Sequence, residues 1–111
     1  MTPPTVIRPE HHASWRADGM GKSTLYQSAH VLVGLNAFEP GQAHALHAHA
    51  GMDKIYIVVE GEGVFLLDDA RLPMRAGDVL IAPDGVAHGV ENTSAARLLV
   101  MAVLAPGPHR P

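Results

Sequence analysis

The sequence predicts an all-β domain, built as a sandwich or a barrel, and three observations favour this class. The chain has 111 residues, which suits a single folded unit, and 47% of them are hydrophobic, as is typical of globular domains. Short apolar runs recur at a spacing of roughly 8–12 residues. The 11 glycines and 9 prolines fall mostly between these runs as turn signals. No stretch keeps a helical period with a cap at each end, so the core is not expected to be helical.

Five runs of apolar residues are the expected strands: 31–38, 55–59, 64–67, 79–82 and 98–104. The first ends before a Pro-Gly dipeptide at 40–41. The second is β-branched and aromatic, which is typical of a buried strand. The third ends at two aspartates at 68–69. The fourth lies between Gly-Asp at 77–78 and Pro-Asp-Gly at 83–85, and the fifth precedes a proline-rich tail. Residues 10–23 are expected to hold at most a helical turn.

Composition excludes several classes of function. The net charge is −3, from 8 basic and 11 acidic residues, and the basic residues form no stripe, so no nucleic acid partner is expected. The absence of cysteine excludes disulfides, thiolate metal sites and a cysteine nucleophile. The N-terminus lacks the apolar stretch of a secretory signal, and the longest apolar run, 98–105, is too short to cross a bilayer. We therefore expect a cytoplasmic protein with no membrane partner.

The chain is rich in histidine, and the residues around position 47 indicate a metal site. Eight histidines are present, and four of them lie between His30 and His49. On a strand, His47 and His49 point to the same face, so their two imidazoles can bind one metal. His44 has the opposite parity, so on a regular strand it should point away as a surface or supporting residue. The third ligand must come from elsewhere, and His88 is the candidate because it follows a tight turn after an expected strand.

Two segments resemble the sequence motifs of the cupin superfamily. The first has Gly41, five residues, His47-Ala-His49 and then Gly61. The second has Gly77, five residues, Pro83-Asp-Gly85, two residues, His88, three residues and Asn92, which matches the second cupin motif at every defined position. Fifteen residues separate the two motifs, as in small single-domain cupins of the conserved-barrel (cupin 2) type.

The resemblance implies a double-stranded β-helix of the jelly-roll type. It implies one cupin domain over residues 1–111, with an N-terminal arm at about 1–23, the first motif at 41–61 and the second at 77–92. Cupins of this kind hold a divalent metal with two histidines and a glutamate from the first motif and one histidine from the second. Exposed sheet edges and the family resemblance together predict a homodimer.

Carried over by position, the histidine ligands are His47, His49 and His88. The glutamate is missing, and two ways of aligning its position disagree. Counting back from Gly61 places it at Lys54, whereas counting forward from His49 places it at Asp53. Either Asp53 is the fourth ligand or the site has three histidines. Two histidines with a carboxylate favour Fe(II), whereas three imidazoles also suit other metals, so the expected cofactor is a divalent transition metal: Fe, Mn, Zn, Ni or Cu.

Lys54 and Tyr56 are the candidate catalytic residues beside the metal, and they share strand parity. A protonated lysine cannot ligate a metal, but it can bind an anionic substrate or pair with an acidic neighbour. Tyr56 is either a proton donor in the pocket or a core residue whose hydroxyl finds a partner. The predicted function is metal-dependent action on a small molecule by an oxygenase, isomerase or lyase. The alternative is a non-catalytic binding module, a sensor or a metal store.

One further motif is rejected. Residues 19–24 look like the end of a P-loop, but the full pattern requires a glycine at the position of Arg16, and no hydrophobic strand precedes it.

Asn92 is expected to support its turn rather than the chemistry.

Overall fold

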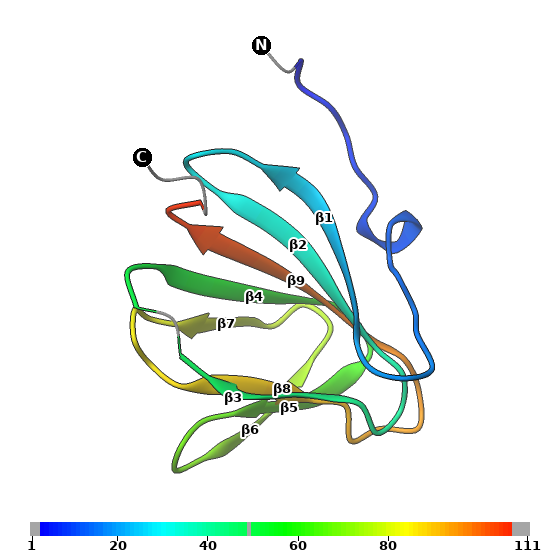
Figure 1. Cartoon of the computed structure of the whole chain (residues 1–111). Coiled ribbons are helices and arrows are strands. Elements are labelled where there is room, and N and C mark those ends of the chain that lie inside the picture. The colour runs from blue at the N-terminus through cyan, green and yellow to red at the C-terminus, as the bar shows by residue number, and fades with distance from the viewer. Residues whose placement is uncertain (1–2, 49, 108–111) are drawn as a thin grey trace.

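A computed structural model describes residues 3–48 and 50–107 of the chain and consists of two facing β-sheets (Figure 1). Within those ranges the elements are η1 (Pro9–His11), β1 (Gly21–Gln27), β2 (Leu32–Phe38), β3 (Ala43–His47), β4 (Asp53–Glu60), β5 (Glu62–Leu66), β6 (Arg71–Arg75), β7 (Val79–Ala82), β8 (His88–Glu91) and β9 (Leu98–Ala105). One sheet has the order β1-β2-β9-β4-β7, and the other has the order β3-β8-β5-β6. The pairings are antiparallel, so the predicted all-β jelly roll is confirmed.

The five expected strands correspond to β2, β4, β5, β7 and β9, and β3 is the strand on which the sequence placed His47. The sequence did not identify β1, β6 and β8, because their residues are polar or mixed and give little periodic apolar signal. β1 and β6 lie at sheet edges, where one side of the strand faces solvent and polar residues are tolerated. β1 also covers Gly21 to Thr24, so the last four residues of the P-loop-like segment are extended strand rather than a phosphate-binding loop.

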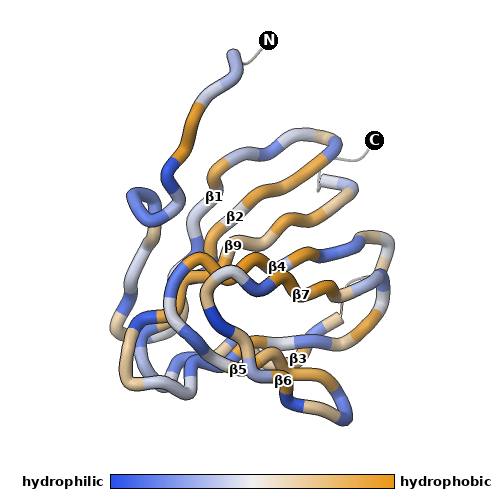
Figure 2. The backbone as a smooth tube through the Cα atoms, turned by 180° about the vertical axis from the view of Figure 1, so that it is seen from behind, coloured by the Kyte–Doolittle hydropathy of each residue, from blue (hydrophilic) through white to orange (hydrophobic). Residues whose placement is uncertain are grey.

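The main core lies between the two sheets. Alternate residues of β4 and β9 point inward, and Tyr56, Val58 and Val100 are almost completely buried against Phe65 and Val90 of the smaller sheet. Figure 2 shows hydrophobic residues running along β2, β9, β4 and β7 of the larger sheet. Burial of each large side chain contributes about 1.5–3 kcal/mol, so this layer accounts for much of the stability.

A second, smaller apolar cluster lies on the outer face of the larger sheet. Leu35, Ala37 and Leu99 are buried there, and Trp15 of the N-terminal arm packs against them. The guanidinium of Arg97 lies 4.5 Å from the centroid of the Trp15 ring and also pairs with Glu39 at 3.1 Å. The arm before β1 thus covers part of this outer face.

Two residues of the second motif have structural roles that the sequence indicated. Gly77 has φ of 94°, a conformation that favours glycine, and its amide donates to the carbonyl of Val58 at 2.9 Å. Asn92 is fully buried, and its amide group donates to the carbonyls of Phe38 at 3.0 Å and Ala96 at 2.8 Å. Its side-chain oxygen accepts from the amide and the hydroxyl of Ser94. Asn92 therefore holds the loop between β8 and β9 against the end of β2.

None of the helical residues in the described ranges forms a segment long and apolar enough to cross a bilayer.

Candidate metal centre and ligand pocket

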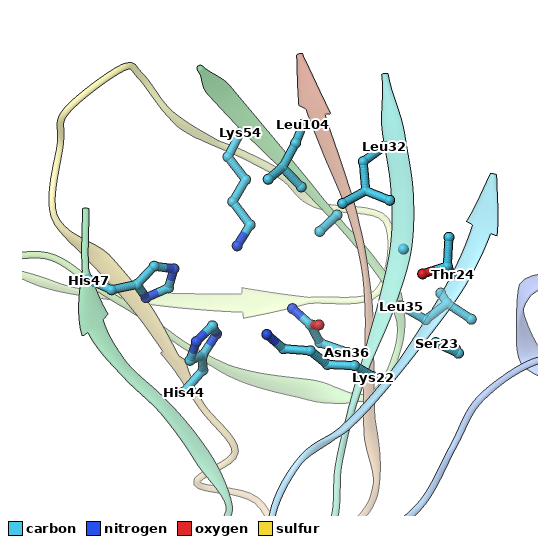
Figure 3. A pocket seen from close by; sticks show the side chains of 12 residues that line it. Lys22, Ser23, Thr24, Leu32, Leu35, Asn36, His44, His47, Lys54 and Leu104 are labelled. Atoms are coloured by element: carbon cyan, nitrogen blue, oxygen red, sulfur yellow. The ribbon is translucent and has the colours of Figure 1, made fainter. Parts of the chain in front are cut away.

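A cavity of about 410 Å³ lies inside the barrel (Figure 3). The larger sheet contributes Lys22 from β1, Asn36 from β2 and Lys54 from β4. His44 and His47 of β3 face them from the smaller sheet. The cavity is thus lined by residues of both sheets and by segments far apart in the sequence.

His44 and His47 both face the cavity, which corrects the expectation that His44 points away. Three residues of β3 span the distance that two residues of β8 span, because His44 pairs with Val90 and His47 pairs with His88. This β-bulge cancels the difference in parity between the two histidines. Their rings stack with centroids 4.1 Å apart and planes inclined by 25°. The expectation was wrong because it assumed a regular strand.

Gly89 is the sequence signal that corresponds to this bulge. It lies on β8 opposite the bulged residues, and a Cβ there would be 2.6 Å from the carbonyl oxygen of His44. A glycine inside a strand often marks a bulge or a close backbone approach.

His47 and His88 lie side by side, as the sequence predicts for two ligands of one metal. Their ring centroids are 4.4 Å apart, and His88 is almost fully buried. In each ring Nδ1 lies 2.9 Å from a backbone carbonyl oxygen, that of Ala45 for His47 and that of Val86 for His88. A carbonyl only accepts, so Nδ1 must carry the proton, and the lone pair of the neutral ring lies on Nε2. A histidine that binds a metal through Nε2 commonly donates its Nδ1–H to a backbone carbonyl in this way.

The remaining predicted ligands are not brought to this pair by the described structure. His49 lies outside the described residues. Asp53 is exposed on the face of β4 opposite to Lys54, and its carboxylate accepts a hydrogen bond from the amide of Asp84 at 2.9 Å. Across residues 3–48 and 50–107, no group of three or more histidine, aspartate or glutamate side chains is placed to hold a metal ion.

Lys54 occupies the inward position that the missing glutamate would take when counted back from Gly61. Its residue exposure is 7%, and Figure 3 shows its side chain pointing into the cavity. Burial, helped by the positive charge of Lys22, lowers the pKa of Lys54 to about 8. The cavity therefore holds a cation where a typical cupin metal site has an anion.

Tyr56 is a core residue that also borders the histidines. Its ring meets Phe65 edge-on at 5.7 Å and His88 at 5.6 Å. Burial raises the pKa of its hydroxyl above the ordinary value, so the phenol keeps its proton at neutral pH. That hydroxyl is fully buried and has no hydrogen-bond partner among the described residues. The structure thus agrees with the alternative in which Tyr56 packs in the core, but the described residues provide no hydrogen-bond partner for its hydroxyl.

The electrostatics of the cavity keep His44 neutral. Burial lowers its pKa to about 4, and the neighbouring basic groups of His47, Lys22, Lys54 and His88 act in the same direction. An imidazolium is thus disfavoured beside two ammonium groups, so His44 offers a neutral ring.

Sequence reasoning missed Lys22 and Asn36 as residues of the cavity. Lys22 belongs to a strand that was not predicted, and Asn36 lies on an expected strand whose inward face could not be assigned. They are paired across β1 and β2, so their side chains enter the cavity together. One signal was present: lysine occurs only twice in the 111 residues, as Lys22 and Lys54, and both residues line this cavity.

A two-sheet jelly roll with imidazoles from β3 and β8 directed inward defines a barrel that encloses a pocket. Residues 34–104 match the family described as Cupin domain, and the chain therefore belongs to the cupin family. The resemblance noted in the sequence is confirmed.

Relatives of known description fall in the same family. The chain is 33% identical over 85 residues to the oxalate-binding protein of Thermotoga maritima, covering 77% of this chain and 69% of that protein. It is 31% identical over 71 residues to gentisate 1,2-dioxygenase of a Ralstonia species, covering 63% of this chain but only 20% of that enzyme. The match to the dioxygenase therefore concerns one part of a longer protein.

Solved structures agree over nearly the whole chain. The protein TT1209 from Thermus thermophilus superposes with a TM-score of 0.87 and 36% identity, covering 93% of this chain and 98% of that one. A protein described as a predicted oxalate decarboxylase from Thermotoga maritima superposes with a TM-score of 0.79 and 26% identity, covering 91% and 98%.

Proposed function

We propose that this cupin holds a divalent transition metal in its barrel and binds a small molecule beside it. The observation that carries the proposal is the pairing of His47 with His88. Their ring centroids are 4.4 Å apart, and the contact of each Nδ1 with a carbonyl directs the proton there and the lone pair to Nε2. Two neighbouring imidazoles in this tautomer fit a metal of the Fe, Mn, Zn, Ni or Cu type.

His49 is the proposed third ligand, on the strength of the first cupin motif alone. Lys54 argues against a fourth ligand at its own position, because an ammonium repels a metal ion. Asp53 faces away from the cavity and contacts the Asp84 amide, which argues against its role as a ligand. The proposed donor set is therefore three histidines. His47, His49 and His88 would hold the metal, which would supply Lewis-acid chemistry to a molecule bound beside it.

The chain's own residues suit the binding of a negatively charged molecule. Lys54 presents its ammonium group to the cavity, whereas Tyr56 is fully buried with its ring against His88 and is not among the residues that line the cavity. In a catalytic version of the site, whether an oxygenase, an isomerase or a lyase, Lys54 attracts the substrate and Tyr56 is the candidate proton donor, through its contact with His88. The description of one relative as an oxalate-binding protein supports a small carboxylate as the ligand.

A second candidate is a module that binds its ligand without turnover. The observation that favours it is the buried Lys54, because a cation at the position of the family's glutamate removes the carboxylate that many cupin metal sites use. The same relative, described by what it binds rather than by a reaction, also supports this reading.

Metal content tests the proposal directly. Protein made without a histidine tag should contain a divalent transition metal by elemental mass spectrometry, at close to one ion per chain after loading. His47→Ala, His49→Ala and His88→Ala should each lower that occupancy at least tenfold. A double His11→Ala/His12→Ala variant is the matched control, because these histidines lie in the N-terminal arm. Equal metal content in all of these proteins would refute the metal site.

Turnover separates the two candidates. Metal-loaded protein should be screened for oxygen uptake and for loss of small carboxylic acids by NMR. Tyr56→Phe tests the candidate proton donor: a loss of turnover by a factor of about 10² or more with unchanged ligand affinity would support that role, and unchanged turnover would leave Tyr56 as a core residue. Ligand binding without turnover by the metal-loaded protein would support the binding module.

A further inference from the structure

Lys54 is a buried lysine that no acidic side chain pairs with in the described part of the chain. Its side chain points into the cavity (Figure 3), and its ammonium group contacts the face of the Tyr56 ring at 4.9 Å. The ion pairs found across residues 3–48 and 50–107 all use arginine. A lysine is rarely buried without a partner, so this one calls for a functional explanation.

The pairing of the larger sheet places Lys54 in an apolar row. Leu104 of β9 lies directly opposite Lys54, and Leu32 of β2 lies opposite Leu104 in turn. Both leucines line the cavity together with Lys54. Apolar surroundings disfavour an ammonium ion more than a neutral amine, so this row favours the neutral form of Lys54.

A second cation acts on the same amine. Figure 3 shows the ammonium group of Lys22 in the same space as that of Lys54, beside His44. Burial, and to a lesser extent the charge of Lys22, lower the pKa of Lys54 to about 8. Roughly a tenth of Lys54 is therefore neutral at pH 7, whereas at the ordinary pKa of 10.5 the neutral fraction would be roughly 3 in 10,000.

The other polar groups that face Lys54 do not hold it as an ammonium ion. His44 and His47 lie across the cavity on β3, and Asn36 lies beside Lys22 on the larger sheet. Among the residues that the structure shows lining the cavity, none is an aspartate or a glutamate. A cavity of about 410 Å³ also leaves room for a molecule of a few carbon atoms next to the amine.

We propose that Lys54 is a nucleophile that forms a Schiff base with a small aldehyde or ketone, with Lys22 as the neighbouring cation that keeps its amine reactive. The lone pair of Nζ attacks the carbonyl carbon, a carbon–nitrogen double bond forms, and the carbonyl oxygen leaves as water with the two protons of the neutral amine. The step needs no oxidant, no reductant and no metal. Lys22 does not touch the substrate in this step, because its charge acts through Lys54.

This activity goes beyond the proposed function, in which Lys54 only attracts the ligand. A protonated Schiff base draws electrons from the adjacent carbon atom, which favours the loss of a proton or of a carbon substituent there. Isomerases and lyases that act on carbonyl compounds need such electron withdrawal. The inference therefore favours these two classes over an oxygenase.

Reductive trapping tests the proposal on the full chain, as purified and after treatment with a chelator. Acetone and pyruvate are the probes, one neutral and one anionic, and cyanoborohydride converts a Schiff base into a stable amine. Peptide mass spectrometry distinguishes Lys54 from Lys22, the only other lysine of the 111 residues. At pH 7, at least one probe should label Lys54 faster than Lys22, by a factor of about ten. Labelling of Lys54 at the same rate as Lys22 or more slowly, with both probes, would overturn the proposal.

The pH dependence separates a reactive amine from a merely accessible one. Nα-acetyllysine in the same tube is the standard, since it corrects for the effect of pH on the reductant. Because the pKa of Lys54 is about 8 and the ordinary value is 10.5, the rate at Lys54 relative to the standard should fall as the pH rises from 8 towards 10.5. A relative rate that stays constant over this range would contradict the proposal.

Two substitutions of Lys22 test the part that this residue plays. Lys22→Met should slow the labelling of Lys54 at pH 7 and move the fall in relative rate to higher pH, whereas Lys22→Arg should leave both unchanged. Arg8→Met is the matched control, since it removes one positive charge from an exposed residue outside the cavity. Unchanged labelling of Lys54 in Lys22→Met, or equal slowing in Arg8→Met, would refute the role of Lys22.

The outcome is independent of the metal site. If chelator-treated protein is labelled at Lys54 but the protein binds no metal, the proposed metal site fails alone. If metal binds and Lys54 is not labelled, only the present inference fails.

Discussion

The ammonium group of Lys54 lies 4.9 Å from the centroid of the Tyr56 ring, on the same inner face of β4. Contact with the face of an aromatic ring stabilises a cation by about 0.5–2 kcal/mol, depending on how dry the site is. This contact offsets only part of the cost of burying a charge, because the pKa of Lys54 is still lowered to about 8. The lysine is thus retained at the expense of stability, which is typical of a residue that serves function.

Replacing Lys54 should stabilise the protein, and the gain should depend on pH. Because the folded-state pKa is lowered from 10.5 to about 8, folding penalises the charged form. The penalty is fully present below about pH 8 and disappears as the pH rises towards 10.5. Lys54→Met should therefore raise the free energy of unfolding at pH 7 by on the order of 1–2 kcal/mol.

Urea unfolding of chelator-treated protein at pH 7 and pH 10 measures this gain. The difference between Lys54→Met and the parent protein should shrink at the higher pH. Arg8→Met is the control, because Arg8 is exposed and lies outside the cavity, so its replacement should give little change at either pH. A gain of the same size at both pH values would show that packing, not charge burial, is responsible.

Asn92→Ala should destabilise the protein by about 2–4 kcal/mol. The substitution removes donors to the carbonyls of Phe38 and Ala96 and an acceptor for Ser94, all around a fully buried side chain. Thr93→Ala changes the neighbouring exposed residue and should have little effect. Denaturant midpoints compare the two variants, and similar midpoints would contradict the supporting role of Asn92.

Gly89→Ala should disturb the bulge in β3. The added methyl group would lie 2.6 Å from the carbonyl oxygen of His44 and 3.1 Å from the carbonyl carbon of Ala45, so the backbone must move. We expect a loss of about 1–3 kcal/mol in stability and altered imidazole signals of His44 and His47 in NMR spectra. Gly19→Ala is the matched control, because a Cβ there meets nothing within 4 Å. Unchanged imidazole signals in Gly89→Ala would contradict the link between Gly89 and the bulge.

Exposed apolar side chains on the outer face of the larger sheet lead us to predict a homodimer. On the edge strand β7, Val79 is 58% exposed and Ile81 is 61% exposed, and they pair with Ile57 and Ile55 of β4. An apolar face of this kind next to an open edge suits a symmetric contact with a second copy. Light scattering should give the mass of a dimer for the parent protein and of a monomer for Ile81→Glu.

Leu72→Glu is the control for that experiment. Leu72 is also an exposed hydrophobic residue, at 42%, but it lies on β6 of the other sheet. It should leave the dimer intact. A parent protein that is monomeric at tens of micromolar, or a dimer that only Leu72→Glu disrupts, would contradict the predicted interface.

The sequence was most informative where residues act through local patterns. The apolar runs and turn signals identified the strands that form the core, and the spacing of the two motifs identified the cupin fold. The neighbouring positions of His47 and His88 follow from the same spacing, because the fold pairs the strands on which they lie.

The sequence was least informative where tertiary structure overrides local periodicity. The inward position of His44 depends on one extra residue in β3 opposite Gly89, which the spacing of the histidines alone does not reveal. Lys22 reaches the cavity only because β1 adds to the edge of a sheet whose order is set by long-range pairing. Neither fact could be inferred without the pairing of distant strands.

The bulge in β3 also indicates how this pocket could diverge. Deleting one residue between His44 and His47 would restore a regular register and turn one of the two rings outward. A change in segment length would thus alter the chemical lining of the cavity without replacing any side chain that lines it. Comparisons of related barrels should therefore consider the number of residues between the histidines as well as their identity, because length alone can alter ligand preference.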